Sequence, residues 1–291
     1  MLSFILCLSP AYAANVVSVQ SVSITPYNEA FRGLESACKC KVKQLVLSEI
    51  QGPHVVREVR REKPGVIVAI GSGALEKIRA INDIPIVCLM VLDVKSATTG
   101  KTNIKGISLD VPPERQLDII HQALPDVSDI GLLFNPEHTG SFVEKAGAAA
   151  RSAGIRLNAN EVRNSKDVPV QLNLMTGKIQ AFWMLPDVSV VTSETAEVLF
   201  LYSLKYRVPV ITFSDKYLEM GALMSLEVDF YDMGVQAGEM VAQILSGTDI
   251  SKISNNIAGK INITINARTA RKLGLTVSDE ILNRAKVIKR D

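Results

Sequence analysis

The stretch VIVAIGSGALEKIRAINDIPIV, residues 66–87, decides the fold that this sequence predicts. In it a buried apolar run ends in small polar residues, a helical stretch follows, and a second apolar run starts around a proline. The same order recurs in IQAFWMLPDVSVVTSETAEVLFLYSLKYRVPVI, residues 179–211. Because both copies are βα units, the repetition predicts an α/β protein made of two doubly wound parallel-sheet lobes with a central cleft.

Apolar runs of strand length and stretches of helical period alternate along the rest of the chain. The expected strands of the first lobe are 15–22, 42–48, 66–70, 84–90 and 104–109, with helices at 28–38, 53–62 and 74–82. The expected strands of the second lobe are 130–134, 155–160, 179–185, 208–213 and 222–226, with helices at 140–153, 166–176 and 192–205. A helix at 230–246, a strand at 261–265 and a helix at 267–273 complete the chain.

These last elements, residues 230–273, follow a complete series of strands and helices in each lobe. They must therefore pack at sheet edges that are still open, which predicts that the chain crosses back between the lobes. We therefore expect an N-terminal lobe from residues 14–110 plus about 227–250, and a C-terminal lobe from 111–226 plus about 251–291. Such crossings would form a hinge.

Composition limits the partners that this chain can have. Its 291 residues are 47% hydrophobic, and 32 basic against 30 acidic side chains give a net charge of +2. Without a block of like charge, neither nucleic acid nor an anionic membrane surface is indicated as a partner. After the first residues no run approaches the roughly 18 apolar residues of a membrane span, so no direct membrane insertion is expected. We also expect a monomer.

The first residues have the pattern of a secretory signal peptide. An apolar segment, residues 1–10, is followed by Ala11, Tyr12 and Ala13, a small-residue cleavage site. We expect residues 1–13 to be removed near Ala13 and the mature protein to be periplasmic. The alternative is that this segment is an apolar first strand.

Three cysteines remain after such cleavage: Cys38, Cys40 and Cys88. An odd count does not fit a disulfide framework, although Cys38 and Cys40 can pair in an oxidising compartment. The pair makes a poor zinc site, because no third or fourth ligand lies near it.

Open parallel sheets bind ligands outside the carboxyl ends of their strands, so the residues that follow these strand ends, most of them polar, are the candidate contacts. They are Tyr27, Ser72, Gly73 and Asp93 in the first lobe, and Asn135, Ser141, Asp187 and Phe213 in the second. The backbone N–H groups at Ser72 suit a carboxylate, and the Tyr27 ring can cover the face of a ligand. The alternatives are a helix cap at Ser72, a core position for Tyr27, and a turn or cap at Asp93.

No catalytic or cofactor motif is complete. Gly100, Lys101 and Thr102 lack the earlier glycine and the following helix of a P-loop, and Glu76 stands where a dinucleotide fingerprint needs its third glycine. The three histidines are scattered, and no nucleophile elbow or Cys/His pair is present. We therefore expect a binding protein, with no enzymatic activity, metal or cofactor.

Nine segments, taken in this order, resemble the solute-binding proteins of ABC importers, in the family described as uncharacterised ABC transport system, periplasmic component. The segments are PYNEAFRGL (26–34), VIVAIGSGA (66–74), IPIVCLMVLD (84–93), NIKGISL (103–109), QLDIIHQALPDVSDIGLLFNP (116–136), FWMLPDVSV (182–190), VPVITFS (208–214), GALMSLEVDFYDMGVQAGEMVAQILSG (221–247) and INARTARKLGL (265–275). The resemblance implies the type I periplasmic-binding fold, a small-molecule solute and an ABC permease in the inner membrane. Better known members bind aromatic amino acids.

The chain departs from the family pattern at residues next to the expected site. Lys105 precedes Gly106 where the family has threonine, residues 138–141 replace Glu-x-Asn-Ser, and Val188 with Ser189 replaces Asn-Thr. The pocket is therefore expected to be less polar, so an aromatic or other carboxylate-bearing metabolite is as plausible as an amino acid. The alternative function is a periplasmic ligand-sensing module that signals to a receptor or kinase.

Overall fold

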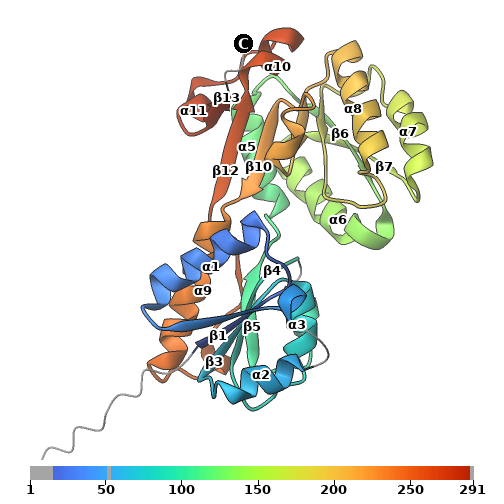
Figure 1. Ribbon diagram of the computed structural model, residues 1–291. Coiled ribbons are helices and arrows are strands. Elements are labelled where there is room, and N and C mark those ends of the chain that lie inside the picture. The colour runs from blue at the N-terminus through green and yellow to red at the C-terminus, as the bar shows by residue number, and fades with distance from the viewer. Residues whose placement is uncertain (1–15, 51–53, 93, 289–291) are drawn as a thin grey trace, which may run out of the picture. The chain divides into compact units, whose positions relative to one another are not determined.

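The computed structural model describes residues 16–50, 54–92 and 94–288 of the chain (Figure 1). The chain divides into two compact units. Unit 1 comprises Met1–Asp110 and Val228–Lys260, and unit 2 comprises Val111–Glu227 and Ile261–Asp291. The chain therefore passes between the units three times. Residues 251–260, which we expected in the second lobe, belong to unit 1.

Unit 1 is built on a six-stranded sheet in the order β11-β5-β4-β3-β1-β2, and every neighbouring pair in it is parallel. Its strands are β1 (Val16–Gln20), β2 (Val42–Val46), β3 (Val66–Ile70), β4 (Ile86–Val91), β5 (Ile104–Ser108) and β11 (Asn256–Ile257). The central strands β1, β3 and β4 are buried along their whole length. Continuous apolar runs are what a sheet covered on both faces requires.

Helices cover both faces of this sheet (Figure 1). The helices of unit 1 are α1 (Thr25–Cys38), α2 (Val55–Arg61), α3 (Ser72–Ile78), α4 (Val94–Ala97) and α9 (Phe230–Leu245), with single 3₁₀ turns η1 (Leu47–Glu49) and η4 (Ile250–Lys252). The α1 helix begins three residues earlier than expected, because Pro26 is compatible with a first helical turn.

The cysteines of unit 1 fall into two classes. Cys38 and Cys40 form a disulfide across Lys39, the left-handed residue that ends α1. Cys88 is a free thiol buried in β4, and burial raises its pKa to about 12. This thiol therefore stays protonated and unreactive at neutral pH.

The α1 and α9 helices, almost 200 residues apart in sequence, pack backbone against backbone. A Cβ atom added to Gly234 would overlap the carbonyl oxygen of Ala30, and one added to Gly33 would overlap the carbonyl oxygen of Tyr231. A Cβ atom added to Gly238 would lie only 2.7 Å from the carbonyl oxygen of Leu34. Small residues at this crossing let the late helix join the early part of the chain, where α9 also contacts β3, β4 and β5.

Replacing Gly234 with alanine is expected to lower the free energy of unfolding by about 2 kcal/mol, because the new methyl group forces the two backbones apart. Gly147 is the matched control, since it lies within a helix of unit 2 and a Cβ there meets only the end of Arg151, at 3.6 Å. Gly147→Ala should raise stability by about 0.5–1 kcal/mol through helix propensity. Urea denaturation measures both changes, and equal effects of the two substitutions would contradict the account.

Unit 2 is built on a seven-stranded sheet in the order β13-β12-β10-β9-β8-β6-β7. Its strands are β6 (Asp129–Phe134), β7 (Arg156–Glu161), β8 (Ala181–Trp183), β9 (Val210–Thr212), β10 (Met224–Val228), β12 (Ile261–Asn266) and β13 (Lys286–Ile288). The neighbouring pairs β7–β6, β6–β8, β8–β9 and β9–β10 are parallel. Two parallel-dominated sheets with helices on both faces confirm the predicted α/β class.

Two apolar cores fill unit 2, one on each face of the sheet. The helices of unit 2 are α5 (Pro113–Ala123), α6 (Pro136–Ser152), α7 (Val168–Leu174), α8 (Ser193–Tyr206), α10 (Ala267–Leu273) and α11 (Asp279–Leu282), with 3₁₀ turns η2 (Ser165–Asp167) and η3 (Asp215–Tyr217). One core includes side chains of α5, α6 and α11, and the other includes those of α7 and α8 (Figure 1). Trp183 is buried in the first core, where its indole N–H donates to Gln116 Oε1 at 3.1 Å.

Among the described residues, no helix has both the length and the apolar character that crossing a bilayer would require.

Candidate functional site

The carboxyl ends of β1 and β3 lie side by side in unit 1, because Gln20 pairs with Ile70 in the sheet. The next residue after β1, Ser21, donates from its hydroxyl to the carbonyl of Ile70 at 3.2 Å. The same hydroxyl accepts from the backbone N–H of Ala74 at 2.8 Å, so Ser21 satisfies a donor at the start of α3.

Tyr27 packs over the backbone of Gly71 at this edge. A Cβ atom built on Gly71 would lie 2.8 Å from the Tyr27 hydroxyl and 2.6 Å from Ser21 Oγ, and Gly71 has a φ of +97°. Glycine is therefore required there for both space and backbone conformation. Burial raises the pKa of the half-buried Tyr27 phenol above its ordinary 10.0, so the hydroxyl remains a hydrogen-bond donor at neutral pH.

The other candidate residues of unit 1 have different positions. Ser72 and Gly73 are exposed at the start of α3. Gly71 precedes the helix as its N-cap and Ser21 supplies the side-chain bond, so Ser72 is not the cap that the sequence offered as the alternative. Asp93 lies outside the described residues.

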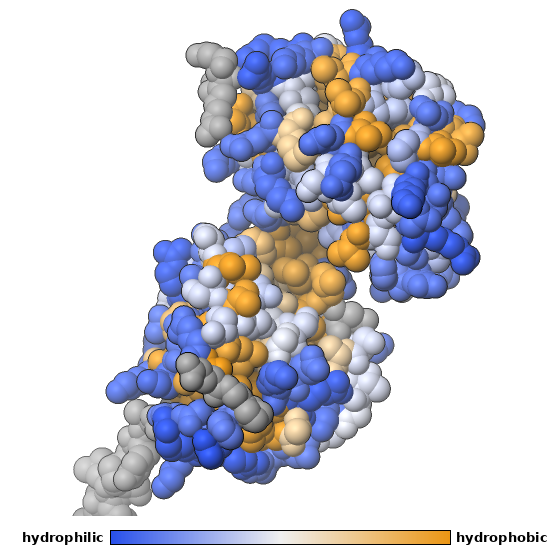
Figure 2. All heavy atoms as spheres, turned by 45° about the vertical axis from the view of Figure 1, so that its right-hand side comes forward, coloured by the Kyte–Doolittle hydropathy of each residue, from blue (hydrophilic) through white to orange (hydrophobic). Residues whose placement is uncertain are grey.

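A buried glutamine fixes the loop that leads to Tyr27. Gln20 is fully buried, donates to the carbonyl of Val22 at 2.7 Å and to Asn28 Oδ1 at 2.8 Å, and accepts from Gln44 Nε2 at 2.9 Å. The loop exposes Val22 and Ile24, with 40% and 47% of their surface accessible. Figure 2 shows apolar residues scattered among hydrophilic ones on one face of the molecule.

In unit 2 a buried carboxylate connects the loops after β6 and β8. Asp187 Oδ2 accepts from the backbone N–H of Asn135 at 2.8 Å and from Thr139 Oγ1 at 2.6 Å. Its Oδ1 accepts from the backbone N–H of Ser189 at 3.0 Å and lies 3.5 Å from His138 Nδ1. The Asp187 side chain has no exposed surface, and a buried carboxylate is stable only when it has such donors.

Asn135 is committed to the same arrangement. Its Oδ1 accepts from the backbone N–H of Glu137 at 3.0 Å, which caps α6, and its Nδ2 donates to Ser189 Oγ at 3.0 Å. Protein groups thus occupy the polar atoms of both Asp187 and Asn135. These two predicted residues are brought into direct contact, and they organise the loops whose exposed groups are Val188 and His138.

Two predicted residues of unit 2 lie outside this hydrogen-bond network within the described part of the chain. Ser141 is exposed on α6, next to Phe142, whose ring contacts Trp183 edge to face at 5.5 Å. Phe213 follows β9, is partly buried, and contacts Tyr217 with ring centroids 5.4 Å apart.

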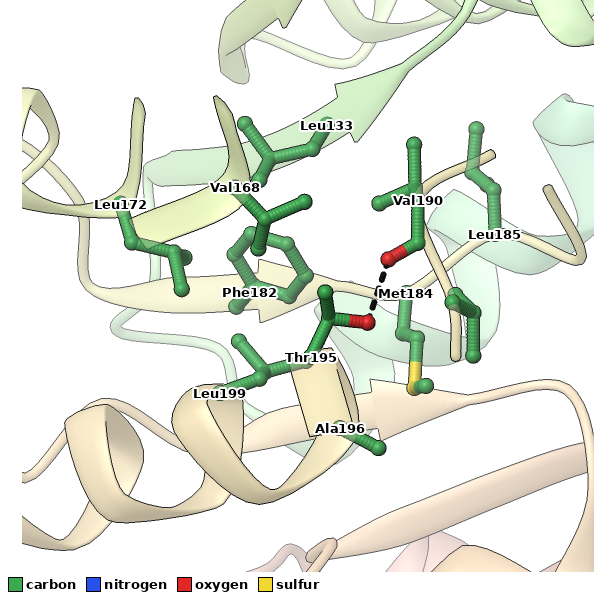
Figure 3. A pocket seen from close by; sticks show the side chains of 11 residues that line it. Leu133, Val168, Leu172, Phe182, Met184, Leu185, Val190, Thr195, Ala196 and Leu199 are labelled. Carbon is green, nitrogen blue, oxygen red and sulfur yellow. Dashed lines mark hydrogen bonds between the residues drawn. The ribbon is translucent and has the colours of Figure 1, made fainter. Parts of the chain in front are cut away.

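Two hollows in unit 2 do not contain any predicted residue. The first is an apolar cavity of about 10 Å³ between the sheet and the α7 and α8 helices, where Thr195 donates to the Val190 carbonyl at 2.6 Å (Figure 3). It has room for about one water molecule and belongs to the core. The second, about 920 Å³ and open to solvent, lies around α10 and β13 and is lined by polar, charged and apolar side chains.

Among the described residues, no group of three or more His, Cys, Asp or Glu side chains could hold a metal ion. The model of the family described as ABC transporter substrate binding protein matches residues 47–289. The chain belongs to this family. Its members are binding proteins rather than enzymes, which confirms the predicted non-enzymatic class.

Three similar proteins show the range of this likeness. The tyrosine-binding protein of Clostridioides difficile is 23% identical over 223 residues, which span 74% of this chain and 64% of the relative's length. A structure of a conserved domain protein from Vibrio cholerae has 27% identity, a TM-score of 0.65 and coverage of 95% of this chain and all of its own. The ligand-free, open structure of a substrate-binding protein with adhesive properties from Clostridium difficile has 19% identity and a TM-score of 0.81. The match covers 96% of this chain and 100% of that structure's chain.

A fourth similar structure, the ABC domain from Streptococcus pneumoniae in complex with L-Trp, is 21% identical with a TM-score of 0.66, over 94% of this chain and 99% of its own. At such identities the structures establish the fold, the type I periplasmic-binding fold that the sequence predicted.

Asp187→Asn is expected to lower the free energy of unfolding of unit 2 by about 2–3 kcal/mol, because the NH₂ group of an amide cannot accept from the donors, Asn135 N–H, Thr139 Oγ1 and Ser189 N–H, that bond to both carboxylate oxygens. Denaturation followed by the fluorescence of Trp183, the only tryptophan in the sequence, measures this effect. Asp126→Asn, at an exposed position of the same unit, is the control and should change stability by less than about 0.5 kcal/mol. Equal stability of the two variants would show that the Asp187 contacts do not hold the loops.

Proposed function

We propose that this chain is the solute receptor of an ABC importer and that it binds a small aromatic carboxylate, an aromatic amino acid above all. One solute would contact both units, which would close around it. A ligand favours closure only if it binds the closed arrangement better than the open one, and contacts to both units at once provide that difference.

The single observation that carries this proposal is the chemical contrast between the two groups of strand-end loops. Unit 1 offers the ring of Tyr27 over Gly71. It also exposes three apolar side chains that follow strand ends in the sequence, Val22 and Ile24 after β1 and Leu92 after β4. Unit 2 offers the loops that Asp187 holds, on which the polar side chain of His138 is exposed. An apolar ring with a charged end would satisfy both, since aromatic surfaces bind ring faces and fixed donors bind acceptors.

The relatives support the same class of solute. One is a tyrosine-binding protein, and one similar structure holds L-Trp. Val188, 77% exposed after β8, adds an apolar surface to the loop that Asp187 organises. We therefore place aromatic amino acids first, and other carboxylate-bearing metabolites with an apolar body second.

The proposal includes a location and a partner. The protein would be exported to the periplasm after cleavage near Ala13, act as a monomer, and deliver its solute to an ABC permease in the inner membrane. The predicted signal peptide, residues 1–13, lies outside the described residues.

Isothermal titration calorimetry with L-tyrosine, L-tryptophan, L-leucine and D-arabinose tests the proposed solute class. Aromatic amino acids should bind with a Kd at least about tenfold below that of L-leucine, and D-arabinose should not bind. Tyr27→Ala should weaken aromatic binding by about tenfold or more, because it removes the ring that we place against the solute.

Tyr206→Ala is the matched control, because Tyr206 is an exposed tyrosine of α8 in unit 2. The Tyr206→Ala variant should bind L-tyrosine and L-tryptophan with the same affinity as the unmodified protein. Preferential binding of the sugar, or equal losses in the two tyrosine variants, would contradict the proposal.

A further inference from the structure

A solvent-open hollow of about 920 Å³ lies at the β13 edge of the unit 2 sheet. Its walls come from three segments: the loop after β9 (residues 215–221), α10 with the residue before it, and β13 (Figure 1). In the sheet order, β10, β9 and β8 separate β12 from β6, the strand that leads to Asn135. A hollow of this volume is large enough for a small organic ligand, and unit 2 forms it alone.

Hydrogen bonds tie the walls of this hollow together. Asn266, the last residue of β12, donates from Nδ2 to the carbonyl of Leu218 at 2.8 Å. Asp215 accepts from the hydroxyls of Ser225 in β10 and Thr264 in β12. On the other side, β12 pairs with β13 in parallel. Because the loop and the strands are held by these bonds, the hollow is formed before a ligand binds, which lowers the cost of binding.

Positive charge gathers around this hollow. Four basic side chains from all three segments line it, and none forms an ion pair with another described residue: Lys216, Arg268, Lys272 and Lys286. With the acidic residues Asp215 and Glu219, the lining carries a formal net charge of +2. The whole chain of 291 residues also has a net charge of +2, so this region concentrates positive charge. Like charges around one hollow repel each other, and an anion among them relieves the repulsion.

Thr269 adds a neutral donor to the wall. Only 8% of its surface is exposed, it lines the hollow, and its hydroxyl forms no hydrogen bond with the rest of the described chain. Its backbone N–H donates to Asn266 Oδ1 at 3.0 Å, so the start of α10 holds the residue in place. Buried polar groups normally have a partner, and a ligand that accepts hydrogen bonds would provide one.

We propose that this hollow binds a small phosphate-bearing anion with two or more negative charges. A phosphate group offers three terminal oxygens, so it can accept from several donors at once, whereas a carboxylate offers two oxygens. The planar guanidinium of Arg268 matches two phosphate oxygens, and the lysines add charge at other positions around the hollow. Cations from separate segments favour an anion that reaches more than one of them. This site goes beyond the proposed function and does not require the aromatic solute.

Affinity and stability should respond differently when a cation of the hollow is replaced. Arg268→Gln removes one of four like charges, so the melting temperature of the free protein should stay the same or rise slightly. The same substitution removes a charged donor, so the binding of inorganic pyrophosphate should weaken by about tenfold. A lower melting temperature with unchanged affinity would assign Arg268 a structural role instead.

Isothermal titration calorimetry with inorganic pyrophosphate tests the site, at a constant ionic strength of roughly 0.15 M so that screening is equal throughout. The unmodified protein should bind pyrophosphate with a Kd below about 1 mM, and citrate, a tricarboxylate, at least about fivefold more weakly. Lys286→Gln, in a different wall, and Thr269→Val should each weaken pyrophosphate binding by about threefold or more.

Arg271→Gln is the matched control, because Arg271 is an exposed residue of α10 that does not line the hollow. This variant should bind pyrophosphate as the unmodified protein does, and every variant should keep the same affinity for L-tyrosine. Hydrogen–deuterium exchange locates the anion independently. Pyrophosphate should slow exchange in residues 215–221, 266–272 and 286–288.

Three results would overturn this inference. The first is no binding of pyrophosphate to the unmodified protein, and the second is binding of citrate as tight as that of pyrophosphate. The third is an equal loss of affinity in Arg268→Gln and Arg271→Gln, which would show unspecific attraction by surface charge. Binding to vesicles of phosphatidylcholine with phosphatidylglycerol, but not to pyrophosphate, would assign the charge to a membrane surface and would also overturn it.

Discussion

The buried carboxylate of Asp187 is the interaction on which the loops of unit 2 depend. Its oxygens accept from residues of two strand-end loops that are about fifty positions apart in the sequence. Removing a charge from water is costly, and only this set of donors compensates for it. The carboxylate therefore fixes the loop conformation, and through Ser189 it also fixes the ring of His138. Binding chemistry is assigned to the groups that remain exposed once these bonds are made.

Unit 1 depends on a different constraint, the close approach of α1 and α9. Gly33, Gly234 and Gly238 leave no room for a side chain between the two helices. Because one helix comes from the start of the chain and the other follows most of unit 2, neither unit is a continuous piece of sequence. The three passages between units follow from this connectivity. They are the segments that would have to bend if the units close on a solute.

The alternation of strands and helices could be predicted because buried parallel strands appear as short apolar runs, such as residues 66–70 and 86–91. The short edge strands β11 and β13 could not, since they have only two and three residues and none of these residues is buried. The sequence also identified Tyr27, Asn135 and Asp187, which end up in close contacts at strand ends, but it could not show that Asp187 is enclosed by donors. Ser21, Gln20 and His138 had no distinctive local pattern, because their roles come from partners 24 to 53 positions away.

The central claim is that the strand-end loops of both units bind one aromatic solute. Hydrogen–deuterium exchange of the whole protein with and without saturating L-tyrosine tests it most directly, because exchange reports each loop separately. The account predicts slower exchange in residues 21–28 and 71–75 of unit 1, together with residues 135–141 and 187–191 of unit 2. Protection confined to one unit, or located around α10 and β13 instead, would contradict it.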